Sequence, residues 1–193
     1  TVNVQGGRLI ARNTAAFGPA GQFITVGTAA LTLDPTIEYQ TDTVMNAYAL
    51  NIGSGNTGTI ELNRATGGPA LTQTAGASTI GNGTLNFEKG ANVTSGTPVL
   101  QFTALSLSAG ATGLGAATLN PVGVDISVAG AVTRPGASAG NLKLDGTSTG
   151  NIISGAMQDN GANKLTVIKQ NTSTWTLAGP NTHTGTTTVN GGT

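Results

Sequence analysis

Apolar and polar residues alternate in short runs along most of the chain, and each run is closed by glycine, asparagine or proline. A period of two is typical of strands that bury one face. The pattern therefore predicts an all-β protein with strands at 23–26, 31–33, 59–62, 84–87, 105–107, 124–128, 142–144 and 165–168. The segment 41–51 also permits a helix, whose apolar face would consist of Val44, Met45, Tyr48 and Ala49.

Two all-β architectures fit this pattern, a β-sandwich and a parallel β-helix (β-solenoid) of short rungs. Six of the seven aromatic residues lie before residue 103, and only Trp175 follows. A sandwich would therefore lack large core residues in its C-terminal half. A solenoid has a narrow interior that stacked valine, leucine, isoleucine, alanine and threonine can fill. We therefore predict the β-solenoid and keep the β-sandwich as the alternative.

The last twenty residues form the most distinctive segment of the chain. Trp175 and Leu177 are expected on one side of a strand, with Thr176 on the other. The next residues, Gly179-Pro180-Asn181, are expected to form a corner, because proline fixes φ and asparagine tolerates left-handed or self-bonded turns. Residues 186–189 would form the following strand. The glycine pair after that strand, Gly191-Gly192, permits a tight reversal.

Residues 150–193 resemble the autotransporter-associated β-strand repeat of bacterial surface proteins. The similarity lies in the Trp175 strand, the small-residue turn, Thr184-Gly185, and the run from Thr187 through Val189 to Gly192. The chain has Pro180 where the family has a small residue and His183 where it has tyrosine. The resemblance implies a right-handed parallel β-helix, export to the cell surface, and a role as a stalk, adhesin or surface structure.

The two ends of the chain are similar to each other. Residues 1–9 read as a variant of residues 188–193 with two residues inserted. The chain also begins like the middle of a strand and ends like the middle of a turn. We therefore expect residues 1–193 to be one β-solenoid domain that is a segment or repeat unit of a longer surface protein.

The charge and cysteine content exclude several classes of protein. Charged residues make up 8% of the chain, and eight lysines and arginines balance eight aspartates and glutamates. A nucleic-acid-binding protein needs clustered positive charge, which this chain lacks. The absence of cysteine excludes a disulfide scaffold and cysteine zinc sites. No apolar run reaches the length of a membrane-spanning helix.

The residues that could carry chemistry are sparse. A glycan-cleaving β-helix would need two or three acids converging in a groove, and the best such group is Asp34, Glu38, Asp42 and Arg64. The more ordinary interpretation is a loop of solvated charges. His183 is the single histidine and lies between two threonines, which favours an exposed turn over a catalytic base. We therefore expect no enzyme activity, no catalytic residue, no cofactor and no metal site.

The sequence thus predicts an extracellular structural protein, a stalk or filament building block on the bacterial surface. Its expected partners are copies of itself or adjacent repeats of the same chain, because a solenoid leaves unpaired strand edges at both ends. Adhesion to cell-surface glycans is a further candidate role. The alternative is a glycan-binding or glycan-cleaving β-helix.

Overall fold

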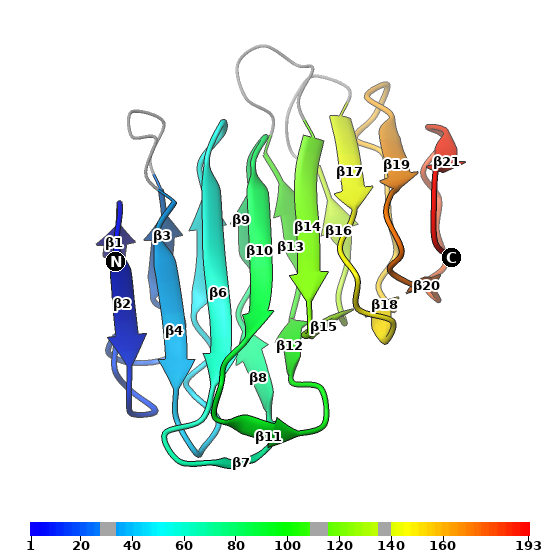
Figure 1. Ribbon diagram of the computed structural model, residues 1–193. Coiled ribbons are helices and arrows are strands. Elements are labelled where there is room, and N and C mark those ends of the chain that lie inside the picture. The colour runs from blue at the N-terminus through cyan, green and yellow to red at the C-terminus, as the bar shows by residue number, and fades with distance from the viewer. Residues whose placement is uncertain (28–33, 109–115, 135–139) are drawn as a thin grey trace.

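The computed structural model describes residues 1–27, 34–108, 116–134 and 140–193. The chain winds into a β-solenoid built from three sheets that run along its axis, with no helix among these residues (Figure 1). All strand pairs are parallel, as successive coils of one solenoid require. The β-sandwich is therefore wrong, because its neighbouring strands would be antiparallel.

Sheet A forms one face of the solenoid and contains six strands. Their order in space is their order along the chain, so each coil lies on the preceding one. The strands are β1 (Val2–Val4), β3 (Phe23–Val26), β5 (Ala49–Ile52), β9 (Ser78–Ile80), β13 (Leu105–Leu107) and β16 (Val132–Thr133).

Sheet B is the longest sheet, with eight strands. In Figure 1 its strands run downward in front, those of sheet A run upward behind them, and the coils advance to the right, which makes the coil right-handed. The strands are β2 (Arg8–Ala11), β4 (Thr36–Gln40), β6 (Thr57–Asn63), β10 (Thr84–Lys89), β14 (Ala116–Val122), β17 (Gly140–Leu144), β19 (Leu165–Lys169) and β21 (Thr187–Val189).

Sheet C contains five strands, and a two-stranded sheet D lies at the lower corner in Figure 1. Sheet C consists of β8 (Thr72–Ala75), β12 (Val99–Phe102), β15 (Asp125–Val128), β18 (Asn151–Ile153) and β20 (Trp175–Leu177). Sheet D consists of β7 (Gly68–Pro69) and β11 (Val93–Ser95).

The interior of the solenoid is filled by the inward residue of each alternating pair. One buried cluster extends from Val4 to Trp175. In the N-terminal and middle coils it includes aromatic rings, such as Phe87 and Phe102, which meet edge to face with centroids 6.0 Å apart. Later coils are filled mainly by aliphatic residues, such as the paired Leu142 and Val167, and Trp175 lies at the end. The shortage of aromatic residues after residue 103 is thus compatible with a filled core.

The predicted strands agree with the structure wherever it describes them. The predicted strand at 31–33 lies outside the described residues. The helix that the spacing permits at 41–51 does not form: the segment contains no helical turn and leads into β5. Its backbone N–H groups bond to other coils: Met45 donates to the side chain of Gln73 (2.8 Å) and Asn46 to Thr14 O (2.8 Å).

The similarity between the two ends of the chain does not place them at equivalent positions. Val2 lies on β1 in sheet A, whereas Val189 lies on β21 in sheet B. The two copies of Thr-Val-Asn therefore occupy different faces of the coil.

Candidate functional site

Two stacked glutamates lie on the outer face of sheet B. Glu38 and Glu61 occupy paired positions on β4 and β6. Arg8, on β2, reaches both of them: Nη1 lies 2.6 Å from Glu38 Oε2, and Nη2 lies 2.8 Å from Glu61 Oε2. The hydrogen bond with Glu38 raises the pKa of Arg8. One arginine therefore neutralises two carboxylates contributed by successive coils.

Glu38 has both carboxylate oxygens occupied. It is only 2% exposed, and its Oε1 accepts a hydrogen bond from Asn63 Nδ2 (2.7 Å). Asn63 Oδ1 in turn accepts from the backbone N–H groups of Arg64 and Asn92 (both 2.9 Å). These bonds connect the outer face of sheet B to the corner that follows it.

Asp42 belongs to a separate network at that corner. Its Oδ1 accepts from Arg64 Nε (2.8 Å) and from the N–H groups of Ala65 and Thr66, and its Oδ2 accepts from the Thr66 hydroxyl (2.7 Å). The hydrogen bond from Arg64 is the main reason that the pKa of Asp42 falls to about 2, and the bond from Thr66 lowers it further. Asp42 thus anchors the turn after β6.

The acid groove considered from the sequence does not assemble. Glu38 pairs with Arg8, Asp42 pairs with Arg64, and Asp34 is exposed and forms no ion pair among the described residues. Sequence reasoning missed Arg8, because it lies one coil earlier and 30 residues away from Glu38. The described part of the chain contains no group of three or more acidic or histidine side chains placed to hold a metal.

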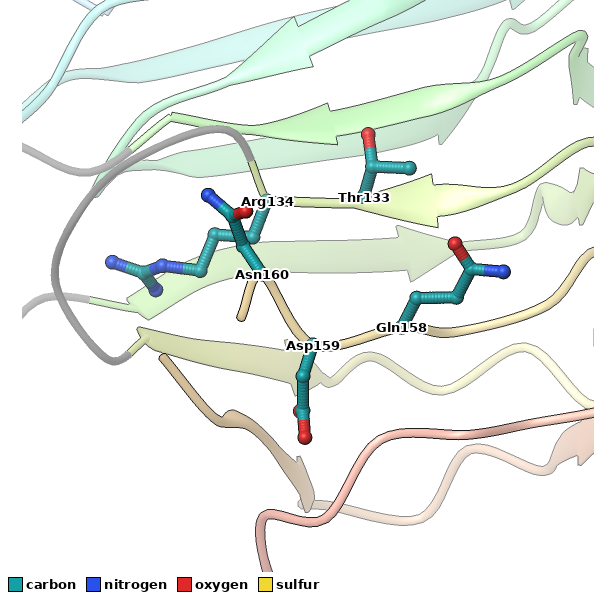
Figure 2. A pocket seen from close by; sticks show the side chains of 5 residues that line it. All are labelled: Thr133, Arg134, Gln158, Asp159 and Asn160. Carbon is teal, nitrogen blue, oxygen red and sulfur yellow. The ribbon is translucent and has the colours of Figure 1, made fainter. Parts of the chain in front are cut away.

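A hollow of about 260 Å³ lies between the end of β16 and residues 158–160, which belong to the next coil and precede β19 (Figure 2). Its one carboxylate, that of Asp159, accepts from Leu165 N (2.8 Å) and from both the N–H (2.8 Å) and the hydroxyl (2.7 Å) of Thr184. These bonds, that of Leu165 first, lower the pKa of Asp159. The lining residues are Thr133, Arg134, Gln158, Asp159 and Asn160.

Arg134 is the other charged residue of this hollow. It is 5% exposed, its Nε has no hydrogen-bond partner, and burial lowers its pKa. The guanidinium packs against Gly140 and points away from Asp159 (Figure 2). The hollow therefore does not bring an acid and a base together.

The predicted strand of the C-terminal motif is β20. Trp175 is buried at the end of the core, Thr176 is exposed, and Leu177 packs partly against the core. The indole N–H of Trp175 donates to Asp145 O at 3.2 Å, across one coil. Trp175 therefore closes the core at the end of the last coils.

The predicted corner follows β20. A Cβ on Gly179 would lie 2.2 Å from Gly155 O, so this glycine lets two successive coils approach closely. Pro180 comes next, and Asn181 Oδ1 accepts from Met157 N at 2.9 Å. Asn181 thus bonds to the neighbouring coil. The one non-glycine residue with positive φ in the described chain is instead Asn171, with φ 54°.

The remaining motif residues lie in the last coil. Gly185 lies against Leu165 O, Val189 is on β21 and is 62% exposed, and Gly191 precedes Gly192, which has φ +69°. His183 Nε2 lies 3.2 Å from Thr187 Oγ1.

Sequence reasoning also missed Lys169, a buried lysine at the corner of the last coils. Its Nζ donates to the carbonyls of Gln170, Asn171 (3.2 Å) and Gly191 (3.1 Å). Burial lowers its pKa, although nearby Asp145 opposes the shift. The sequence does not indicate that Lys169 donates to these carbonyls, because a lysine at the end of a strand usually lies in solvent. The bonds become visible only when the neighbouring coil is in place.

Comparison with known proteins links the end of the chain to one family. Residues 167–193, which cover β19 after its first two residues, β20 and β21, match the sequence model of the Passenger-associated-transport-repeat family. No curated protein and no solved structure is significantly similar to the chain. No described helix is long and apolar enough to cross a membrane. The matched segment and the parallel coil together fit an autotransporter passenger-like β-helix.

Proposed function

We propose that this protein is a non-catalytic building block of an extracellular stalk or filament, and that its coil is extended by copies of itself or by adjacent repeats of the same chain. The passenger-repeat match favours a place at the cell surface. The carboxylates of Glu38, Asp42 and Asp159 all serve as hydrogen-bond acceptors that join coils or hold turns, which is the chemistry of a scaffold.

The single observation that carries the proposal is the open edge of sheet B at each end of the coil. The six strands between them pair on both sides, but β2 pairs only with β4, and β21 only with β19. Thr186 O and Asn190 N bond back to β19. Because backbone groups alternate in direction along a parallel strand, those of Thr187 and Val189 face the open edge.

An open edge of this kind is a template for another strand. Charge repulsion does not oppose stacking of two copies, since the net charge of the chain is zero. We therefore expect β2 of another copy, or the equivalent strand of the next repeat, to pair with β21.

The test uses a variant that removes a hydrogen-bond donor from the open edge of β21 and leaves the bonds between β19 and β21 in place. Val189→Pro removes one N–H from the open edge, and Val189→Ala is the matched control that keeps it. Wild type and Val189→Ala should show concentration-dependent association by analytical ultracentrifugation, and Val189→Pro should sediment as a monomer.

A tandem duplication separates pairing within a chain from pairing between chains. The duplicated chain should unfold at a higher urea concentration than the single copy, and Val189→Pro in its first copy should remove the gain. The proposal is wrong if the single copy stays monomeric at all concentrations and the duplicated chain shows no gain.

A further inference from the structure

The outer face of sheet A carries an apolar hollow of about 350 Å³. It is lined by residues of sheet A and of the segments just before its strands. Its size falls within the range of ligand-binding pockets, about 300 to 1,000 Å³.

The floor of the hollow contains a column of alanines. Ala77, Ala104 and Ala131 each precede a strand of sheet A. The strand residues that follow them are paired, Leu105 with both Ser78 and Val132, so the three alanines stack on successive coils. One small apolar side chain thus recurs every 4.8 Å or so along the axis.

A column of hydroxyl groups runs beside the alanines. Thr79 is paired with Ser106, and Ser106 with Thr133, so their side chains also stack and point outward. None of the three hydroxyls forms a hydrogen bond within the described chain. Each coil therefore offers one free donor and acceptor next to one apolar contact.

An aromatic ring lies at one end of the hollow. Phe23 is 51% exposed and is paired with Ala49 on the neighbouring strand β5. Phe23 and Ala77 line the same hollow although β5 separates their coils. No lining residue is charged, so the hollow suits an uncharged partner.

We propose that this hollow, formed by Phe23, the alanine column and the hydroxyl column, binds a linear uncharged polysaccharide that runs along the solenoid axis. Sugar rings carry apolar C–H faces that pack on alanine methyl groups and stack on Phe23, and hydroxyls that bond to Thr79, Ser106 and Thr133. A repeating polymer also matches a surface that repeats the same chemistry on each coil.

A protein partner fits this surface less well. It would bury the three hydroxyls and would have to supply a hydrogen-bond partner for each, since a buried unsatisfied polar group costs about 1 to 3 kcal/mol. A second copy of this chain on the hollow is therefore treated as an outcome that contradicts the proposal.

The test is native gel electrophoresis at pH 8.8, in gels that contain laminarin, mannan, dextran or xylan, with polygalacturonate as the charged control. At least one neutral polymer should retard the wild-type protein, and polygalacturonate should not. Phe23→Ala should weaken binding at least tenfold. Ala104→Arg should abolish retardation, because its side chain fills the hollow.

Matched controls separate loss of the hollow from loss of the fold. Gln101→Arg adds the same side chain to the outer face of sheet C, where Leu100 and Phe102 point inward, and should bind like wild type. If Ala104→Arg fails to fold by circular dichroism, Ala131→Arg replaces it. Thr79→Val and Thr133→Val remove hydroxyls at nearly constant shape and should each weaken binding about threefold or more.

The proposal is overturned if none of the four neutral polymers retards the protein, or if the arginine variants in the hollow bind like wild type. It is also overturned if the wild type forms a dimer that Ala104→Arg dissociates while Val189→Pro does not. Binding at the hollow and pairing at the coil ends are independent, because Val189→Pro should leave retardation unchanged.

Discussion

Replacing Arg8 should destabilise the first coils of the solenoid, because it is the cation shared by Glu38 and Glu61. These glutamates occupy paired positions on neighbouring strands, which lie about 4.8 Å apart. Two unit charges at that distance repel by about 3 kcal/mol at an effective dielectric constant of about 20.

Solvent reduces this value, since the Arg8 side chain is 49% exposed. We therefore expect Arg8→Met to lower the free energy of unfolding by about 1 to 3 kcal/mol at pH 7. Adding Glu38→Gln should recover much of the loss, because one of the two repelling charges is then absent.

The assay is urea denaturation of the wild type, both single variants and the double variant, followed by circular dichroism. Fluorescence of Trp175 reports the opposite end of the coil in the same samples. The reasoning fails if Arg8→Met changes stability by less than about 0.3 kcal/mol. It also fails if Glu38→Gln lowers the stability of the Arg8→Met protein further.

Two more variants test other contacts. The pKa of Asp42, about 2, lies below its ordinary value of 3.8, so the stability that Asp42 contributes is present above pH 4 and lost as the pH falls towards 2. The urea midpoints of wild type and Asp42→Asn should therefore converge between pH 4 and pH 2, and a constant difference would contradict this. Gly179→Ala places a Cβ 2.2 Å from Gly155 O and should change the fluorescence of Trp175 at lower urea than in wild type. Gly67→Ala, whose Cβ has only an ordinary contact at 3.6 Å, is the control, and equal midpoints would refute the close approach.

Much of the fold could be predicted from the sequence because its strands are specified locally. The alternation in Thr84-Leu85-Asn86-Phe87 is visible in four letters, and the structure buries Leu85 and Phe87 as that pattern predicts. The segment 41–51 left a helix open as an alternative, because spacing alone does not distinguish a helical face from a non-helical chain whose N–H groups bond to neighbouring coils.

The contacts between coils could not be predicted in the same way. Arg8 reaches Glu38 across 30 residues and Glu61 across a further coil, and Lys169 meets Gly191 only because the last coil folds over it. The hollow on sheet A likewise depends on which alanines come into register. To predict such pairings one must know the number of residues in each coil, and that number is not constant.

The varying length of the coils has a consequence for how such a protein can change over time. From Thr57 to its partner Thr84 the chain travels 27 residues, but from Val167 to Thr187 it travels only 20. The strands nevertheless stay aligned, because the corners absorb the difference. Insertions and deletions confined to corners are thus tolerated without shifting any strand. Related chains can therefore diverge in sequence and length while they keep the same ladder of backbone hydrogen bonds.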